Sequence, residues 1–195
     1  IDASIENNVK EFILASSSEV YQMASIIPTN EMVQLSIPDP MNPRYSYGAG
    51  KIISEIIAIN FGRKYFDKVM IFRPHNIYGP NMGFEHVIPQ FILRMNDLIK
   101  SSSNSSISFP IKGSGDETRA FCFIDDFIDG IRIMNEKGKH LNIYHIGTDH
   151  EIAIKKLALI IAKYFEVDIK INPGKSVEGG TSRRCPDISK LKKLG

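Results

Sequence analysis

The chain has 195 residues, 43% of them hydrophobic and 24% charged, which suits a globular protein with one sizeable core or two small ones. Its 24 Lys and Arg residues nearly balance 22 Asp and Glu residues, so no strong field favours nucleic acid or an acidic membrane. Two distant cysteines argue against a disulfide framework or a metal site and suggest a reducing cytoplasm, and no apolar run approaches the ~20 residues that span a bilayer.

The first half of the chain predicts a strand, a long loop and a helix. Residues 11–15 form a short apolar run that stops at three serines, which is typical of a buried parallel strand whose carboxyl end opens onto a loop. Four prolines between residues 22 and 44 predict a loop there. Apolar spacing predicts a helix over residues 45–66 whose isoleucines cover more than one narrow stripe. One side of it should meet a sheet and the other a partner helix, which predicts a homodimer.

The rest of the chain alternates short strands and helices. Residues 69–72 predict a second strand that ends in a polar loop, and residues 87–99 predict a helix followed by a serine-rich linker at 101–106. Two short strands around a glycine turn are predicted over residues 107–111 and 118–124, and a helix capped by Asp125 and Asp126 follows over residues 125–135. The chain then predicts a strand over residues 142–146, a helix over 152–165 and a last strand over 168–171. This alternation predicts a mostly parallel α/β layer, with mixed elements after Gly83 forming a smaller substrate-covering lobe.

Tyr47 and Lys51 stand four residues apart in the predicted helix, so they lie on one face of it. An ammonium beside a phenol favours the phenolate, so the pair can act as a general base. Tyr-x-x-x-Lys also occurs by chance, and serine clusters are often turns or caps. The functional interpretation gains weight because the serines, this helix and the polar loop after residue 72 should meet at one sheet edge.

Four motifs occur in order between residues 15 and 126. They are Ala15-Ser16-Ser17-Ser18-Glu19-Val20-Tyr21, Tyr47-x-x-x-Lys51, Arg73-Pro74-x-Asn76-x-Tyr78-Gly79-Pro80 and Gly113-x-Gly115-x-x-Thr118-Arg119-x-Phe121-x-x-x-Asp125-Asp126. Together they resemble the extended short-chain dehydrogenase/reductase family, and within it the NAD-dependent nucleotide-sugar epimerases, dehydratases and decarboxylases. The resemblance implies a Rossmann-like parallel sheet, of which this chain holds the C-terminal part, with NAD as cofactor and a nucleotide-diphosphate sugar as substrate.

The resemblance also implies roles for individual residues. Tyr47 would remove a sugar hydroxyl proton, Lys51 would favour its phenolate and hold the nicotinamide ribose, and Ser17 would hydrogen-bond the reacting oxygen. The remaining positions that match the family contact the nicotinamide (Pro74, His75), the substrate (Asn76, His86, Val87) and the nucleotide diphosphate (Arg119), with Arg183 or Arg184 as a loose counterpart of a further substrate arginine.

The chain departs from the family at its start. Extended members open with a strand, a glycine-rich turn and a helix that receives the dinucleotide pyrophosphate, and the sequence contains no such segment. Residues 1–82 are therefore expected to be a partial Rossmann-like domain and residues 83–195 mainly a substrate-binding lobe with interleaved sheet elements. A hypothesis of another class is a truncated, non-catalytic binding or dimerisation module.

Glu19 bears on the choice of reaction. Dehydratases of the family tend to place Asp and then Glu after the catalytic Ser or Thr, whereas this chain has Ser18 and Glu19. Serine is a poor acid for protonating a departing hydroxyl, which argues against 4,6-dehydration. Epimerisation through a 4-keto intermediate is the preferred prediction, with decarboxylation and dehydration as alternatives.

Overall fold

A computed structural model describes residues 1–101, 106–176 and 180–195 of the chain. The chain forms two compact units, each built from separate segments. The first unit comprises residues 1–77, 120–149 and 185–195, and the second comprises residues 78–119 and 150–184. The division predicted from the sequence, between a partial Rossmann-like domain (residues 1–82) and a substrate-binding lobe (residues 83–195), stays a prediction.

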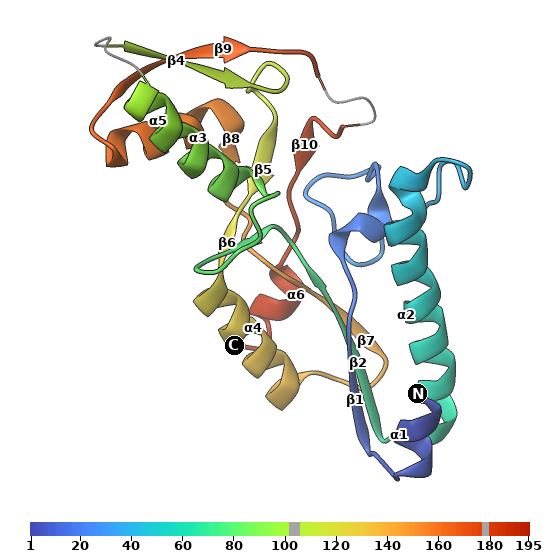
Figure 1. Ribbon diagram of the computed structural model, residues 1–195. Coiled ribbons are helices and arrows are strands. Elements are labelled where there is room, and N and C mark those ends of the chain that lie inside the picture. Colours follow the sequence, from blue (N-terminus) through green and yellow to red (C-terminus); the bar gives the residue numbers. More distant parts are fainter. Residues whose placement is uncertain (102–105, 177–179) are drawn as a thin grey trace. The chain divides into compact units, whose positions relative to one another are not determined.

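The first unit is built on a parallel sheet of three strands in the order β1-β2-β7 (Figure 1). Strand β1 (Glu11–Ala15) pairs with β2 (Lys68–Pro74), and β2 pairs with β7 (Asn142–Ile146). The register places Ala15 opposite Phe72, so β1 and β2 end at the same edge of the sheet. This confirms the predicted parallel α/β layer, whose carboxyl edge is where ligands bind in open sheets.

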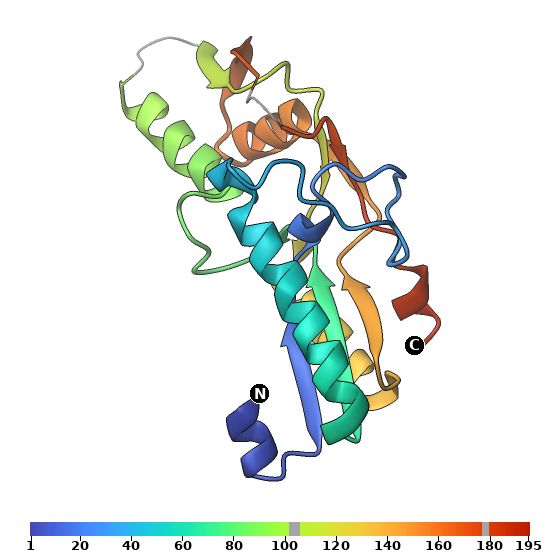
Figure 2. The same ribbon diagram turned by 90° about the vertical axis from the view of Figure 1, so that its right-hand side faces the viewer.

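Helices cover both faces of this sheet (Figures 1 and 2). Helix α2 (Ser46–Tyr65) packs against β1 and β2, whereas α4 (Ile124–Lys137) and α6 (Ser189–Lys192) pack against β7. The short elements of this unit are α1 (Asp2–Glu6), the 3-10 turns η1 (Ser18–Tyr21) and η2 (Pro43–Tyr45), and β6 (Cys122–Phe123), which pairs with β3 (Ile77–Tyr78).

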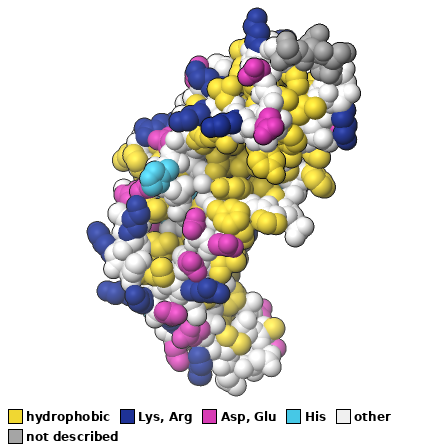
Figure 3. All heavy atoms as spheres, turned by 90° about the vertical axis from the view of Figure 1, so that its left-hand side faces the viewer, with side chains coloured by type: hydrophobic (Ala, Val, Ile, Leu, Met, Phe, Trp, Pro, Cys, Tyr) yellow, Lys and Arg dark blue, Asp and Glu magenta, His cyan; other side chains and the backbone are white. Residues whose placement is uncertain are grey.

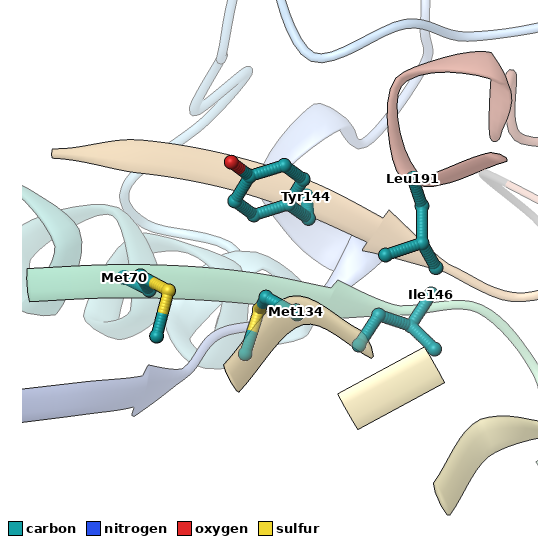
Figure 4. Close-up of a cluster of buried hydrophobic side chains, with 5 residues drawn as sticks. All are labelled: Met70, Met134, Tyr144, Ile146 and Leu191. Carbon is teal, nitrogen blue, oxygen red and sulfur yellow. The ribbon is translucent and has the colours of Figure 1, made fainter. Parts of the chain in front are cut away.

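The core of the first unit lies on the two faces of the sheet. On the α4 side, buried side chains from β2, α4, β7 and α6 form one cluster, drawn in Figure 4: Met70, Met134, Tyr144, Ile146 and Leu191. On the α2 side, Ala58 packs with Phe66, Val69 and Ile71. Burial of apolar surface at about 25 cal/mol per Å² is the main force that holds the helices on the sheet.

The second unit contains two helices and two small sheets. Helix α3 (Val87–Ser101) packs on α5 (Ile154–Tyr164), and β4 (Ser106–Ile111) pairs with β9 (Asp168–Pro173) in parallel. The other sheet has the order β10-β5-β8, with bounds Arg183–Arg184, Thr118–Ala120 and Glu151–Ala153. Hydrophobic side chains gather in the upper part of the face in Figure 3, and the exposed ones in α3 and α5 include Ile92, Leu93, Leu159 and Ile160.

Two details differ from the sequence-based expectations, and one prediction falls outside the described residues. The strands on either side of the Gly113 turn do not pair with each other, because β4 pairs with β9 and β5 pairs with β10 and β8. Asp125 and Asp126 lie in the first turn of α4 instead of capping it, where their charges still suit the positive end of the helix dipole. Residues 102–105 of the predicted serine-rich linker lie outside the described residues.

Within the described ranges, no helix is long and apolar enough to cross a bilayer. The same residues contain no group of three or more His, Cys, Asp or Glu side chains arranged to hold a metal ion.

Candidate active site

The carboxyl ends of β1 and β2 and the first turns of α2 come together in the first unit. The backbone N–H of Ser16 donates to the carbonyl of Phe72 over 2.8 Å, which extends the strand pairing one residue past β1. Helix α2 approaches η1 so closely that a Cβ atom added at Gly48 would stand 2.6 Å from the carbonyl oxygen of Glu19. A glycine at this position therefore lets the helix reach the end of the strand.

Tyr47 and Lys51 occupy the side of α2 that faces this edge. The Lys51 ammonium donates to the carbonyl oxygen of Ala15 over 2.9 Å and lies 5.7 Å from the centre of the Tyr47 ring. Tyr47 itself is 56% exposed, so its phenol is accessible to a ligand. The structure thus brings the tyrosine and the cation together at the strand end.

Ser17 precedes η1 and caps it. Its Oγ accepts a hydrogen bond of 3.2 Å from the backbone N–H of Glu19, as serine side chains do at helix starts. The Ser17 side chain is buried, and its hydroxyl proton remains a donor because capping uses only a lone pair. Glu19 is half-buried, and its carbonyl accepts from the Gln22 side chain over 2.7 Å.

A buried ion pair lies beneath these residues. Glu55 in α2 and Arg73 in β2 are each 2% exposed, and the Arg73 Nη2 donates to Glu55 Oε2 over 2.6 Å while Nε donates to Oε1 over 2.8 Å. The Ser16 hydroxyl also donates to Glu55 Oε1. Burial lowers the pKa of Arg73, but the hydrogen bonds and charge of Glu55 outweigh it and raise that pKa above its ordinary value.

The ion pair continues into a second buried pair of side chains. Arg73 donates to the Tyr21 hydroxyl, which lies 2.7 Å from His145 Nε2. Burial raises the pKa of Tyr21 to about 12, although Arg73 opposes the shift. Tyr21 therefore stays protonated at neutral pH and is a poor alternative to Tyr47 as a base.

The polar residues after β2 are held by the first unit itself. His75 is buried, and its ring centre lies 4.6 Å from that of His145. Asn76 has a positive φ of 44°, a conformation that asparagine tolerates, and its side-chain amide donates to the carbonyl of Ala120 over 3.2 Å. Pro74 is half-buried at the end of β2.

In the second unit, the three predicted substrate arginines lie on neighbouring strands. Arg184 in β10 pairs with Arg119 in β5, so their side chains project from the same face of the sheet, whereas Arg183 projects from the other. Arg183 is bound to Glu151, with contacts of 2.6 and 3.0 Å, and these hydrogen bonds lower the pKa of Glu151. Arg119 donates to the carbonyls of Thr118 and Thr181 over 2.7 and 2.8 Å.

The two remaining predicted substrate residues lie at the start of α3. His86 is exposed and precedes the helix, and Val87 is its first residue. The His86 carbonyl accepts from the backbone N–H of Gln90 over 3.0 Å.

Sequence reasoning missed the buried group of Glu55, Arg73, Tyr21 and His145. One feature of the sequence indicates the place of Glu55 in this group: Glu55 is a lone acid among the isoleucines of α2, one helical turn after Lys51. A charge inside an apolar run requires a partner when it is buried. Nothing in the sequence identifies Arg73 as that partner.

Comparison with known proteins shows the family of the chain. A model of the NAD dependent epimerase/dehydratase family matches residues 1–147. The chain belongs to this family. Similar proteins include a trifunctional UDP-glucose 4,6-dehydratase/UDP-4-keto-6-deoxy-D-glucose 3,5-epimerase/UDP-4-keto-L-rhamnose-reductase of Arabidopsis thaliana, 31% identical over 98% of this chain and 27% of the relative. UDP-glucuronic acid decarboxylase 6 of the same plant is 26% identical over 93% of this chain and 51% of the relative.

Among solved structures, a dTDP-glucose 4,6-dehydratase of Streptomyces venezuelae with NAD and TYD bound matches with a TM-score of 0.78 and 25% identity, over 98% of this chain and 56% of that one. The chain thus spans roughly a quarter to just over half of the length of these relatives. The predicted fold class and family are confirmed, and NAD is the cofactor of this family.

The described residues fit one half of NAD. Lys51 and Tyr47 offer an ammonium and a phenol at the carboxyl edge of the sheet, where ligands bind in open α/β sheets, and their contact with the nicotinamide ribose stays a prediction. In residues 1–101, 106–176 and 180–195, no strand leads through a glycine-rich turn directly into a helix, which is the arrangement that binds a pyrophosphate.

Proposed function

We propose that this chain is part of an NAD-dependent nucleotide-sugar epimerase that works through a 4-keto intermediate. The observation that carries the proposal is the placement of Lys51 against the carbonyl of Ala15, with Tyr47 one turn away at the edge of the parallel sheet. Membership of the NAD dependent epimerase/dehydratase family supports it.

In the proposed reaction, Tyr47 takes the proton of the sugar 4-hydroxyl as the hydrogen on C4 leaves as hydride, which converts the alcohol to a ketone. Lys51 stabilises the phenolate of Tyr47, and Ser17 donates a hydrogen bond to the oxygen that becomes the carbonyl. When bound, NAD would supply the acceptor for this hydride and the source of its return. Return to the opposite face of the ketone, with the proton going back from Tyr47 to the oxygen, gives the epimer.

The second unit supports a role in holding the nucleotide diphosphate. Arg119 and Arg184 are paired on neighbouring strands, and a guanidinium binds phosphate oxygens in a bidentate manner. Glu151 offsets the charge of Arg183, and Arg183 or Arg184 stays the proposed counterpart of the further substrate arginine. Asn76, His86 and Val87 remain proposed contacts with the sugar nucleotide, and Pro74 and His75 remain proposed contacts with the nicotinamide.

The later fate of the ketone depends on few residues. Ser18 is buried at the start of η1 and is no acid for a departing hydroxyl, which favours epimerisation over 4,6-dehydration. Decarboxylation is the second candidate because a UDP-glucuronic acid decarboxylase is among the relatives. Incubation of the full-length protein with NAD and candidate nucleotide sugars, followed by NMR of the products, separates an epimer, a decarboxylated pentose and a 4-keto-6-deoxy sugar.

The remaining assignments concern the whole protein. Residues 1–82 are proposed to be part of a Rossmann-like domain and residues 83–195 mainly the substrate-binding lobe. Helix α2 is proposed to pair with the same helix of a second copy. The alternative of a non-catalytic binding module predicts a native protein without an upstream glycine-rich segment, and N-terminal and intact-mass analysis distinguishes the two.

Substitution of Tyr47 tests the proposal directly. In the full-length protein, Tyr47→Phe removes the proton acceptor and is expected to lower turnover of the nucleotide sugar by at least ~10²-fold, the usual size of a general-base contribution. Tyr65→Phe is the matched control, because Tyr65 is a similarly exposed tyrosine at the other end of the same helix and should keep full activity. Unchanged turnover of Tyr47→Phe would contradict the assignment.

A further inference from the structure

Two residues that flank the Ser17 segment are fixed to the same buried ion pair. Ser16, just before the segment, donates its hydroxyl proton to Glu55. Tyr21, just after it, accepts a hydrogen bond from Arg73 on its hydroxyl oxygen. The four residues between them, 17–20, include the proposed Ser17 and Glu19. Both ends of this short segment are therefore held by one pair of charges.

The ion pair can hold these ends firmly because it is buried and well formed. Its two parallel hydrogen bonds, of 2.6 and 2.8 Å, give a bidentate contact of fixed orientation. Both side chains are 2% exposed, so water does not compete for these bonds. The Arg73 guanidinium also lies over the Tyr21 ring, 4.9 Å from its centre, which adds a second contact with the same residue.

The same pair joins the two elements that carry the rest of the site. Glu55 lies one helical turn after Lys51, on the same side of α2. Arg73 immediately precedes Pro74 at the end of β2. A shift of either charged side chain would therefore alter the distance between the Ser17 hydroxyl and the Tyr47–Lys51 face of the helix.

We propose that Glu55 and Arg73 are positioning residues that clamp Ser16 and Tyr21, and so hold Ser17 in register with Tyr47 and Lys51. Only the expected effect of this role on turnover rests on the proposed function. The ordering of residues 17–20 is a property of the chain itself and is measured without substrate.

The first measurement is amide hydrogen exchange of the chain without ligands. Glu55→Gln keeps the shape of the side chain but removes its charge, and Glu55→Leu with Arg73→Met replaces the pair with an apolar contact of similar volume. Replacing a buried ion pair in this way commonly preserves or raises stability, so this double variant is expected to fold even if Glu55→Gln does not. In both variants, the amides of residues 17–21 should exchange at least about tenfold faster, with no change in α5 of the second unit.

The second measurement is turnover by the full-length protein. Displacement of a reacting group by about 1 Å can cost 10²-fold in rate, so kcat of both variants should fall by about 10- to 100-fold. KM should change by less than about threefold, because neither residue contacts the substrate in the proposed arrangement. Asp129→Asn is the matched control: it breaks an exposed Arg132–Asp129 contact of 3.2 Å in α4 and should change neither quantity.

Each outcome decides for or against the clamp. If the double variant recovers both the melting temperature and kcat, the ion pair is only a stabilising contact and the proposal is overturned. Unchanged exchange at residues 17–21 in the folded double variant overturns it as well. If the unmodified full-length protein turns over no nucleotide sugar, the proposed function fails, and the exchange measurement alone still decides whether the clamp exists.

Discussion

His145 has a single neutral tautomer because of its two partners. Its Nδ1 lies 3.2 Å from the backbone carbonyl of Asp187, which only accepts hydrogen bonds, so Nδ1 carries the proton. Nε2 must then accept, and the Tyr21 hydroxyl donates to it over 2.7 Å. Burial lowers the pKa of His145, with Arg73 adding to the shift and Glu31 opposing it. A protonated ring would require the Tyr21 oxygen to accept from Nε2 and to turn its own proton to the carbonyl of Asn30, 3.2 Å away.

This tautomer predicts a loss of stability in mild acid. Between the ordinary histidine pKa near 6.5 and its lower value in the folded chain, the unfolded state binds the proton and the folded state does not. The free energy of unfolding should therefore have its highest value above about pH 7. Below pH 6.5 it should fall by up to about 1.4 kcal/mol per pH unit. Urea unfolding at pH 7.5, 6.5 and 5.5 measures this decline.

The pH dependence should follow His145 and not histidines in general. His145→Gln removes the titrating ring and should flatten the decline between pH 6.5 and 5.5, whatever its effect at pH 7.5. His150→Gln, at an exposed position, should leave the decline as it is. An equally steep decline in His145→Gln would show that other groups titrate instead.

At the scale of elements, helix α2 has one face that packs on the sheet and η1 and an opposite face that is exposed. The face toward the sheet and η1 is made of small residues and one acid: Gly48, Glu55, Ala58 and Gly62. A Cβ atom at Gly62 would stand 2.9 Å from side-chain atoms of Val69 and Leu141, so small residues let the helix lie close to the strands. Most of the large isoleucines point away from the sheet.

The outward face of α2 supports the proposed homodimer. Ile53 and Ile56 are 55% and 53% exposed, Ile57 is also exposed, and the three lie at i, i+3 and i+4 on one stripe. A contiguous apolar stripe on a helix is a common interface between identical subunits.

We therefore expect the protein to sediment as a dimer and Ile56→Glu to shift it toward monomer, because a carboxylate would be desolvated at the centre of the interface. Sedimentation velocity over a range of concentrations measures the shift. Leu159→Glu, at a similarly exposed apolar position in α5, is the matched control and should leave the dimer intact. A monomer at all concentrations would contradict the assignment of this face.

The elements of the first unit were largely predictable from local pattern. The strands at residues 11–15 and 142–146 have the predicted bounds, and the helix predicted over 45–66 spans Ser46–Tyr65. Apolar runs bounded by polar residues define such elements without knowledge of the fold. The position of Tyr47 and Lys51 at the strand end followed from the helix and the direction of a parallel sheet.

Contacts between distant segments were not predictable. The pairing of β4 with β9 joins residues about 60 positions apart, and the sequence between them gives no sign of it. The same holds for Arg73 and Glu55, since a charge in an apolar element can be exposed, paired or neutral. Register between strands and partners of buried charges are set by the whole fold, which is why the clamp beneath Ser17 became visible only in the structure.

At the scale of the whole molecule, the three-stranded sheet has an open edge at β1, and the helices that cover its two faces leave part of β1 exposed. Among the described residues, β1 pairs only with β2, and Ile13 on β1 is exposed. Parallel sheets are normally buried on both faces. Together with the fraction of its relatives that this chain spans, this suggests that further strands of the full-length protein complete the sheet at β1.

This arrangement predicts how NAD binding divides between the chain and the full-length protein. The residues described here offer partners for the nicotinamide ribose, whereas the pyrophosphate needs a glycine-rich turn and a helix N-terminus. Titration calorimetry should therefore detect NAD binding by the full-length protein and a Kd at least about 100-fold weaker for residues 1–195, because residues 1–195 lack several charge-assisted hydrogen bonds to the pyrophosphate.

A substitution in the full-length protein tests the ribose half of the site. Lys51→Met should weaken NAD binding by about tenfold, the loss of one charge-assisted hydrogen bond, and Lys64→Met at the other end of α2 should not weaken it. Equal affinity of the chain and the full-length protein would mean that the pyrophosphate is bound by residues other than a glycine-rich segment, and the proposed division of the cofactor site would be wrong.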